Sequence, residues 1–428
     1  MFWSQLYSCA VIVISPLVGV GLLCKSRGRV RCGERFGVWE KSNCSEGPTI
    51  WFHGASMGEV RGLVPVIKLF KERHPTIRTL LTSTSPTGLE VARTEVDEIH
   101  ILPIDTVSFH IRAIGKRNIL GLIINETEVW PSLLLVARTK KIPTFLVNAR
   151  ISDMTIKRYE KLRFLLRESL PQFTRVLTGT KESFDRYLSL GCTESQLRII
   201  GNSKYDGVRV VSEGEREDFR NRFGFDSAPI LCLGSIRDGE EAPWIAAIKA
   251  LHNDGFKFHT IVAPRHREKF EYFATILTAS NMPFTRYTTW EKRSIDSYEG
   301  NKILLLDTYG KLLEAYSVSS IAFIGATLLN IGGHNPFEAA AQGVPVIVGP
   351  YVQNIKNEVA DLARVGALTT VRDKGDIVEV LRNCFTHPKD FMQKGRQGAI
   401  QWSQHQGSAL RIMEELESNI EIPDAAPI

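Results

Sequence analysis

The alternation of hydrophobic and polar positions divides the chain into a uniformly apolar start and a long α/β body. Residues 2–24 carry no charged side chain and consist mostly of Val, Ile, Leu, Gly and aromatic residues. From residue 49 onward, short β-branched runs alternate with segments of helical periodicity. Because these short runs are almost continuously apolar, they predict parallel strands covered by helices on both faces of the sheet.

The predicted elements form two series separated by a polar stretch. In the first series, we expect strands near residues 49–53, 77–83, 99–104, 119–125, 143–148 and 175–179, and helices near residues 58–72, 131–140 and 155–169. In the second series, we expect strands near residues 229–235, 258–264, 302–307, 321–326 and 345–349, and a helical tail over residues 388–417. The charged, glycine-containing residues 202–228 between them are typical of a domain boundary.

This order predicts an α/β protein with two Rossmann-like, doubly wound domains. Ligands of such domains bind at the carboxyl ends of the strands, and we expect them in a cleft between the two. The expected divisions are residues 1–35 as anchor and basic flank, 36–210 as N-terminal domain, and 211–428 as C-terminal domain including the last helix. The 428 residues, 43% hydrophobic and 23% charged, exclude a disordered or collagen-like chain.

The apolar start predicts a membrane anchor. As a helix it would be about 35 Å long, enough to cross a hydrocarbon core of about 30 Å. The basic cluster that follows places the body on the cytoplasmic side, and consists of Lys25, Arg27, Arg29, Arg31 and Arg35. A cleaved signal peptide fits poorly because no basic residue precedes the run. A buried core helix and, because of Pro16, a re-entrant segment stay open as alternatives.

Two strand ends of the first series carry acidic residues. Glu59 follows a strand and falls in the first turn of a helix, where the helix dipole favours an ionised carboxylate that can act as a general base. The same spacing also fits a capping box of Ser56 and Glu59. Glu126 and Glu128 follow another buried strand, although Thr127 or Glu128 can equally serve only to start the next helix. Lys204 lies near the domain junction, as a cation of the cleft or as an ordinary solvated lysine.

Three strand ends of the second series suit a nucleotide. Arg265 follows a strand and offers a planar fork for phosphate. Residues 307–312 end another strand and begin a helix. Residues 325–338 combine a Gly-Gly loop with Pro336 at a helix start, where amide groups can hold a phosphate and Glu338 can accept from a ribose. The chain has no DxD pair, P-loop or HExxH motif, so no metal is expected.

The segments HGASMGE, ETEVWP, NAR at 148–150, GNSKYD, APRH, DTYGKL and GGHNPFEAAA together resemble the Kdo transferase family. These membrane-associated glycosyltransferases place 3-deoxy-D-manno-octulosonic acid (Kdo) on lipid A. The segments occur in family order and spacing and cover nearly the whole chain. The resemblance implies a GT-B fold and transfer of one or more Kdo units from CMP-Kdo to a lipid A precursor, lipid IVA, in lipopolysaccharide inner-core synthesis. It further implies no metal or other cofactor, and a single anchor on the cytoplasmic face of the cell inner membrane.

The resemblance also implies roles for individual residues. By position, Glu59 matches the general base of an inverting displacement, and Glu126 and Lys204 match residues that stabilise the transition state; the choice between Glu126 and Glu128 stays open. The matches to the CMP-binding segments are Pro264, Arg265, Tyr309, Gly310, Lys311, Asn335, Pro336, Phe337 and Glu338. Lys311 stands where the family commonly has a glutamate, so no side-chain role is implied for it.

Two alternatives remain. One keeps the fold but uses a UDP-sugar, in another GT-B transferase or an epimerase. The other is a non-catalytic, nucleotide-binding scaffold at the membrane. Nucleic-acid binding is disfavoured, because the net charge of +6 is concentrated near the start of the chain and no basic stripe with interleaved aromatics follows.

Overall fold

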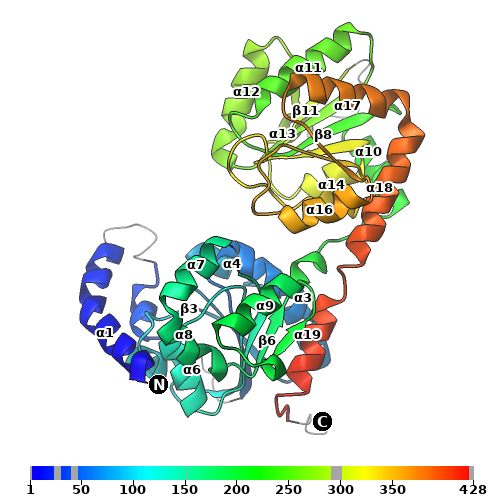
Figure 1. Ribbon diagram of the computed structural model, residues 1–428. Coiled ribbons are helices and arrows are strands. Elements are labelled where there is room, and N and C mark those ends of the chain that lie inside the picture. Colours follow the sequence, from blue (N-terminus) through cyan, green and yellow to red (C-terminus); the bar gives the residue numbers. More distant parts are fainter. Residues whose placement is uncertain (1, 24–29, 40–46, 152, 291–300, 424–428) are drawn as a thin grey trace. The chain divides into compact units, whose positions relative to one another are not determined.

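The computed structural model describes residues 2–23, 30–39, 47–151, 153–290 and 301–423. The chain divides into two compact units (Figure 1). Unit 1 comprises Met1–Gly207 together with His405–Ile428, and unit 2 comprises Val208–Gln404. Each unit contains one seven-stranded parallel sheet. The expectation of two doubly wound α/β domains is therefore confirmed.

The sheet of unit 1 has the strand order β3-β2-β1-β4-β5-β6-β7. Its strands are β1 (Pro48–His53), β2 (Arg78–Ser83), β3 (Glu98–Ile101), β4 (Asn118–Asn125), β5 (Thr144–Ala149), β6 (Arg175–Thr178) and β7 (Leu197–Ile199). Its helices are α1 (Phe2–Leu23), α3 (Met57–Arg73), α4 (Pro86–Val91), α5 (Val107–Ile114), α6 (Pro131–Thr139), α7 (Asp153–Lys161), α8 (Arg163–Ser169), α9 (Lys181–Leu190) and α19 (Ser408–Glu417). Short 3-10 turns include η1 (Cys32–Phe36) and η4 (Ser203–Tyr205).

Alternate residues of the strands enter two separate cores. Ile50 and Phe52 of β1 pack in one cluster with apolar side chains of α3 and α19. Trp51, which lies between them, enters the cluster that contains Leu133 and Leu134 of α6. Because neighbouring strand residues point to opposite faces, an all-apolar strand requires helices on both sides. This is the arrangement that the near-continuous apolar runs predict.

Unit 2 repeats the plan with the order β10-β11-β9-β8-β12-β13-β14. Its strands are β8 (Ile230–Ile236), β9 (His259–Pro264), β10 (Thr285–Arg286), β11 (Ile303–Leu305), β12 (Ile321–Ile324), β13 (Val346–Val348) and β14 (Leu368–Thr370). Its helices are α10 (Glu213–Arg222), α11 (Glu241–Asn253), α12 (Phe270–Ala279), α13 (Tyr287–Trp290), α14 (Leu312–Ser317), α15 (Phe337–Ala340), α16 (Lys356–Arg364), α17 (Lys374–Thr386) and α18 (Pro388–Ser403).

The last helix corrects one expected division. Residues 211–428 were predicted as one C-terminal domain, but α19 belongs to unit 1. The tail is interrupted at Gly407, which has a left-handed φ of 80°. The carboxylate of Asp206 then accepts hydrogen bonds from the amides of Gly407 and Ala409, and the apolar stripe of α19 packs in the α3 core. An amphipathic stripe predicts that a helix covers a sheet, but does not say which sheet.

The apolar start forms the helix α1, as expected. No helix in the described residues has the length and apolar character needed to cross a bilayer. The helix packs against α6 and α8 of unit 1. Most of the basic cluster that was predicted to follow it, residues 25–29, lies outside the described residues.

Candidate active site

Glu59 lies beside the point where the strand order of unit 1 reverses, between β1 and β4. Ser56 is the N-cap of α3, and its hydroxyl accepts from the Glu59 amide at 3.3 Å. In return, the Glu59 carboxylate accepts from the Ala55 amide at 2.8 Å and from the Ser56 hydroxyl at 3.2 Å. The alternative of a capping arrangement is therefore correct. It does not exclude a second role, since each carboxylate oxygen has a further lone pair.

Glu126 and Glu128 follow β4 at the same edge. Glu126 has a left-handed φ of 60°, an uncommon conformation for a residue other than glycine, asparagine or aspartate, and its amide donates to Val147 at 2.9 Å. Its carboxylate lies 3.6 Å from Nε of Arg150. Residues held in such conformations cluster at functional sites, where the surrounding structure over-determines them.

The three carboxylates influence one another electrostatically. Burial, with Glu126 nearby, raises the pKa of Glu59 above its usual value. Burial and the charges of Glu59 and Glu126 raise the pKa of Glu128 to about 7. Like charges gathered in one partly buried place disfavour ionisation. A carboxylate whose pKa is shifted toward neutrality is suited to accept a proton during a reaction near pH 7.

A buried amide network fixes this edge. Asn125 donates to the backbone oxygen of Glu59 at 2.7 Å and accepts from Asn148 at 2.7 Å. Asn148 accepts from the amide of Ser203 at 2.8 Å, and the Ser203 hydroxyl donates to the Gly62 carbonyl at 2.6 Å. Neither asparagine was assigned a role from sequence, although Asn125 ends β4 and Asn148 is the last residue but one of β5. Together they join β4, β5, α3 and η4.

Lys204 lies on η4, directly after the network residue Ser203. The network therefore brings the lysine backbone against α3, the helix that carries Glu59. The Lys204 ammonium lies 4.8 Å from the ring centroid of Tyr205. A helical Gly62 accommodates this packing, because an added Cβ would lie 3.2 Å from Asn125 Nδ2.

Cationic side chains gather at the corresponding edge of unit 2. Arg237 follows β8, and Arg265 follows β9, where its amide donates to Ile236 at 3.1 Å. Burial, Arg265, Arg237 and His266 together lower the pKa of His334 to about 4. Within the described residues, Nε of Arg237 and Nε2 of His334 are buried without a hydrogen-bond partner. The Asp238 carboxylate lies 3.9 Å from Nε of Arg237, beyond hydrogen-bond distance, so these buried polar atoms suit an anion such as a phosphate.

Glu240 holds the loops of this edge together. Its fully buried carboxylate accepts from the amides of Arg237, Ala326, Thr327 and Leu328 at 2.8–2.9 Å. Glu240 thereby links the loop after β8 to the loop after β12. Sequence reasoning overlooked the segment 235–241 (SIRDGEE). Its signal was the same as that of Arg265, a charged turn directly after an apolar strand.

The remaining predicted residues of unit 2 occupy several strand ends. Pro264 ends β9, and the exposed Tyr309 accepts from the Arg267 amide at 2.8 Å. Gly310 has a left-handed φ of 83°, which favours glycine. The Lys311 ammonium pairs with Glu314 at 2.8 Å, so its side chain supports α14.

The Gly-Gly turn leads to the start of α15. Asn335 accepts from the amide of Phe337, and Pro336 is the N-cap, with Glu338 exposed in the first turn. Phe337 is buried. At this helix start, Asn335 and Phe337 therefore support the local structure, whereas the Glu338 side chain is exposed.

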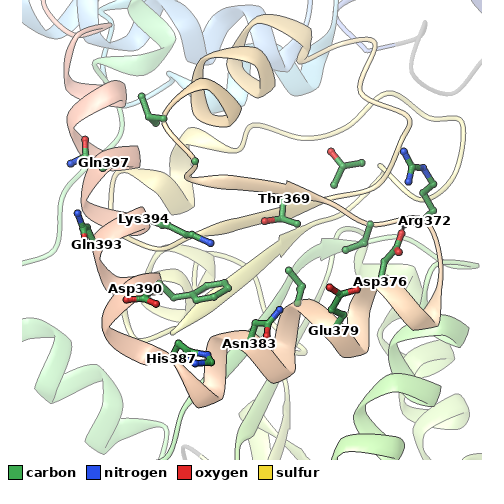
Figure 2. Close-up of a pocket in the computed structure, with 16 residues that line it drawn as sticks. Thr369, Arg372, Asp376, Glu379, Asn383, His387, Asp390, Gln393, Lys394 and Gln397 are labelled. Carbon is green, nitrogen blue, oxygen red and sulfur yellow. Dashed lines mark hydrogen bonds between the residues drawn. The ribbon is translucent and has the colours of Figure 1, made fainter.

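A groove of about 850 Å³ lies in another part of unit 2, and its lining residues are drawn in Figure 2. It is lined by β14, α17 and α18, and its labelled side chains carry both signs of charge, such as Asp376 and Lys394. None of the predicted site residues lines it. The candidate site residues therefore lie at a strand edge of each unit and not in this groove. Within the described parts of the chain, no group of three His, Cys, Asp or Glu side chains could hold a metal ion.

Comparisons with known proteins link the chain to one family of glycosyltransferases. Residues 30–207 match the family model described as 3-deoxy-D-manno-octulosonic-acid transferase (kdotransferase). A 3-deoxy-D-manno-octulosonic acid transferase of Haemophilus influenzae is 29% identical over 98% of this chain and 99% of its own. One of Chlamydia pneumoniae is 28% identical over 92% and 91%. The crystal structure of UDP-GlcNAc 2-epimerase from Neisseria meningitidis aligns with a TM-score of 0.57 at 15% identity, covering 87% of this chain and 100% of its own.

Two parallel-sheet α/β units define a GT-B-like protein, and the likeness to the epimerase supports that fold alone. The family model matches residues 30–207, and the two relatives match nearly the whole chain. These matches support the Kdo transferase family of glycosyltransferases.

Proposed function

We propose that the protein transfers Kdo from CMP-Kdo to a hydroxyl of a phosphorylated lipid A precursor, lipid IVA, in lipopolysaccharide inner-core synthesis. The observation that carries the proposal is the division of charge between equivalent edges of the two sheets. Unit 1 gathers Glu59, Glu126 and Glu128, whereas unit 2 gathers Arg237, Arg265 and His334. The first set suits proton removal from an acceptor, and the second suits the phosphate of a nucleotide donor.

The proposed reaction is a direct, inverting displacement. The carboxylate of Glu59 removes the proton from the acceptor hydroxyl while that oxygen attacks the anomeric carbon of Kdo. The bond between this carbon and the phosphate oxygen breaks, and CMP leaves with the electron pair. Glu126 stabilises the oxocarbenium charge that develops, and Lys204 and Arg265 stabilise the departing phosphate. No metal is needed in this scheme because cationic side chains and helix amides serve the leaving group.

The decisive experiment incubates the purified protein with CMP-Kdo and tetraacyl lipid A precursor and weighs the product by mass spectrometry. We expect the acceptor mass to rise by one or more Kdo residues, and EDTA to leave the rate unchanged. A parallel reaction with UDP-GlcNAc tests the epimerase alternative. An unchanged acceptor mass, with the CMP-Kdo supply verified, would contradict the proposal. CMP binding without turnover would favour a scaffold instead.

The role of Glu59 can be separated from its capping role by Glu59→Gln. Glutamine also fits the third position of a capping box, so α3 keeps its start while the proton acceptor is lost. We expect kcat to fall about 10³-fold, within the usual range for removal of a general base. CMP binding and the melting temperature should stay unchanged.

A matched control lies in unit 2. Ser212 and Glu215 form a capping box at the start of α10. Glu215→Gln makes the same chemical change in the same motif away from the carboxylate cluster, and should retain wild-type kcat. Near wild-type kcat in Glu59→Gln would show that another group is the base.

We further propose that the protein is bound at the cytoplasmic face of the inner membrane through α1. One side of this helix is covered by unit 1, and its other side exposes Leu6, Val13 and Leu17. This supports a helix embedded in the membrane surface. Val13→Glu with Leu17→Glu should abolish flotation with anionic vesicles, whereas the exposed substitution Ile400→Glu in unit 2 should not. Unchanged flotation of the double variant would contradict an anchor at α1.

A further inference from the structure

The end of β2 and the loop after it carry a run of hydroxyl side chains, at Ser83, Thr84, Ser85 and Thr87. Strand β2 is a direct neighbour of β1 in the sheet. Because the two strands are parallel, this loop lies at the same edge as Glu59 and the start of α3. Ser85 is the N-cap of α4, yet its side chain makes no capping hydrogen bond. Capping of α4 therefore does not account for the run.

Two of these hydroxyl groups converge on one backbone oxygen. The Ser83 hydroxyl donates to the Ala55 carbonyl at 3.0 Å, and the Thr84 hydroxyl donates to the same oxygen at 2.8 Å. Ser83 is fully buried, and its hydroxyl also accepts from the Ser85 amide at 3.2 Å. Since a carbonyl oxygen has two lone pairs, both of its acceptor positions are filled. The peptide after Ala55 is therefore fixed from the neighbouring strand end.

This fixed peptide joins the two groups that hold the Glu59 carboxylate. Glu59 accepts from the amide of Ala55 at 2.8 Å and from the hydroxyl of Ser56 at 3.2 Å. The Ala55 carbonyl belongs to the planar peptide between these two donor residues. Rotation of that peptide would move the two donors relative to each other, so that they would no longer both reach the carboxylate. The hydroxyl groups at the end of β2 thus act on the direction of the Glu59 side chain without touching it.

The approach of the two strand ends depends on glycine on both sides. A Cβ added at Gly88 of α4 would lie 2.4 Å from the Ser83 hydroxyl oxygen, too close for a real contact. A Cβ added at Gly54, just before Ala55, would lie 3.0 Å from the amide nitrogen of Val60 in α3. Larger side chains at either position would therefore separate the end of β2 from the start of α3.

The loop is held from its other side by Arg35. Both terminal nitrogens of the Arg35 guanidinium group donate to the Thr84 carbonyl at 3.4 Å. The Arg35 carbonyl accepts from the Ile104 amide at 2.8 Å, so η1 is itself fixed against the segment that follows β3. The sequence placed Arg35 in the basic cluster after the apolar start, and the structure engages its half-buried side chain with the protein. Thr84 is thereby held through both its backbone and its hydroxyl.

We propose that Ser83 and Thr84 are positioning residues for the general base, and that they direct the Glu59 carboxylate toward the acceptor hydroxyl through the Ala55 peptide. Neither residue needs to touch the substrate, because the Ala55 carbonyl transmits their effect. Arg35 acts one step further away, by holding the backbone of Thr84. The inference rests on the proposed function for the role of Glu59, whereas the chain of hydrogen bonds does not.

The test is the double variant Ser83→Ala with Thr84→Val, which removes both hydroxyl groups and keeps the side chains close in size. We expect kcat for Kdo transfer to fall about tenfold, the effect of one lost hydrogen bond at the reacting group. The KM for CMP-Kdo should change less than about twofold. The matched control is Ser85→Ala with Thr87→Val, which removes the same two types of hydroxyl from the same loop. Since these hydroxyl groups bond to each other at 2.7 Å, kcat of the control should equal that of the wild type.

A single-residue comparison decides the matter if the double variant does not fold. Thr84→Ser keeps the hydroxyl and should retain wild-type kcat, whereas Thr84→Val removes it and should lower kcat about threefold. Melting temperatures establish that each variant is folded. Equal kcat in Thr84→Ser and Thr84→Val would contradict the inference.

The pH profile separates positioning from a general loss of structure. Burial raises the pKa of Glu59, and the hydrogen bond from the Ala55 amide lowers it. If the amide loses its direction, this pKa rises further, and a base that must be ionised then works only at higher pH. The acid limb of the kcat profile should therefore move to higher pH in Ser83→Ala with Thr84→Val but not in the control. Both variants keep the charged groups that face this end of α3, namely Glu126, Glu128, Arg150 and Lys204.

Hydrogen–deuterium exchange gives a readout that needs no turnover. In Ser83→Ala with Thr84→Val, peptides that cover residues 53–59 should exchange roughly threefold to tenfold faster than in the control. If kcat, the acid limb and exchange all equal those of the control, the inference is overturned. Faster exchange with an unchanged kcat and pH profile would overturn it as well, because the hydrogen bonds would then exist without positioning the base. If the wild type transfers no Kdo, the proposed function fails, while the exchange experiment still decides whether the hydroxyl groups hold this segment.

Discussion

In both sheets, charged side chains lie beside the point where the strand order reverses, but the charges are opposite in sign. In unit 1 the order reverses between β1 and β4, and in unit 2 between β8 and β12. The first edge carries Glu59, Glu126 and Glu128, and the second carries Arg237 and Arg265 with the neutral His334. The shared topology thus determines where a ligand binds, while the loops after the strands determine its chemistry.

A third charged region shows what a purely structural cluster looks like. In unit 1, His100 lies 2.8 Å from Glu34 and 2.7 Å from Glu98, which also pairs with Arg117 at 2.5 Å. Here each buried charge has a partner of opposite sign. At the two candidate edges, like charges also gather, although Arg150 lies 3.6 Å from Glu126 and Asp238 lies 3.9 Å from Arg237; such gathering is costly for the folded state. This difference separates sites that await a ligand from sites that are complete without one.

The largest expected effect that tests this comparison is on donor binding by unit 2. Arg265→Ala should raise the KM for CMP-Kdo about 30-fold, because a charged hydrogen bond to phosphate is lost. The KM for the lipid acceptor should change far less. Steady-state kinetics with each substrate varied in turn measures both values.

The control for this effect is Arg382→Ala. Arg382 pairs with Asp254 at 2.6 Å on the exposed surface of unit 2, so its loss should alter KM less than about twofold. An equal rise of the KM for CMP-Kdo in both variants would mean that Arg265 contributes only through the overall positive charge of unit 2. An unchanged KM in Arg265→Ala would remove the phosphate site from this edge.

The central strands could be predicted from the sequence, because a strand that is buried on both faces is a nearly continuous run of apolar residues. The edge strands β7, β10 and β14 were not expected. Their sequences, LRI, TR and LTT, are short and partly polar. Residues 155–169 form two helices where one was expected, and the polar boundary stretch contains α10. The side on which α19 packs depends on contacts with Asp206, which lies about 200 residues away in the chain.

The site was predictable as far as strand ends go. Glu59, Glu126 and Arg265 each follow a buried strand, and parallel strands bring such residues to one edge. Glu240 also lies in a charged turn after a buried strand, but its supporting role could not be recognised, because its partners Ala326 to Leu328 are far away in the sequence. The Asn125–Asn148 pair was overlooked for the same reason. A strand-end position can be predicted locally, whereas the distant contacts that make a residue support a site cannot.

A smaller effect concerns stability at the acidic edge. The pKa of Glu128 is raised from 4.5 to about 7, so the folded state holds a proton that the unfolded chain releases. Its favourable contribution is complete below pH 4.5 and is lost as the pH rises through 7. Relative to the wild type, Glu128→Gln should therefore gain about 2 kcal/mol in the free energy of unfolding between pH 5 and pH 8.5. Urea denaturation at both pH values measures the difference.

The control for Glu128 is the exposed Glu90 of unit 1, whose replacement by glutamine should leave the pH dependence unchanged. A wild-type pH dependence in Glu128→Gln would mean that neither burial nor the neighbouring carboxylates raise the pKa of Glu128. The acidic edge would then resemble the paired cluster around His100.

The smallest effect has the opposite sign and belongs to the basic edge. Burial and the neighbouring arginines lower the pKa of His334 from 6.5 to about 4, so the unfolded chain takes up a proton first as the pH falls. The stability contributed by the neutral imidazole is complete above pH 6.5 and is lost toward pH 4. Between pH 7.5 and pH 5, His334→Gln should lose about 1 kcal/mol less of its free energy of unfolding than the wild type does. The effect is small because exposure and salt weaken the repulsion between His334 and the arginines. The exposed His387→Gln is the control.

An added anion sharpens this last measurement. If the basic edge binds phosphate, saturating CMP brings a negative charge beside His334 and raises its pKa toward the usual value. The acid-side loss of stability in the wild type should then shrink, and His334→Gln should show no such change in slope. The pH dependence contributed by Glu128 should not respond to CMP. If CMP altered both edges alike, the charge division between the two sheets would not correspond to a division of substrates.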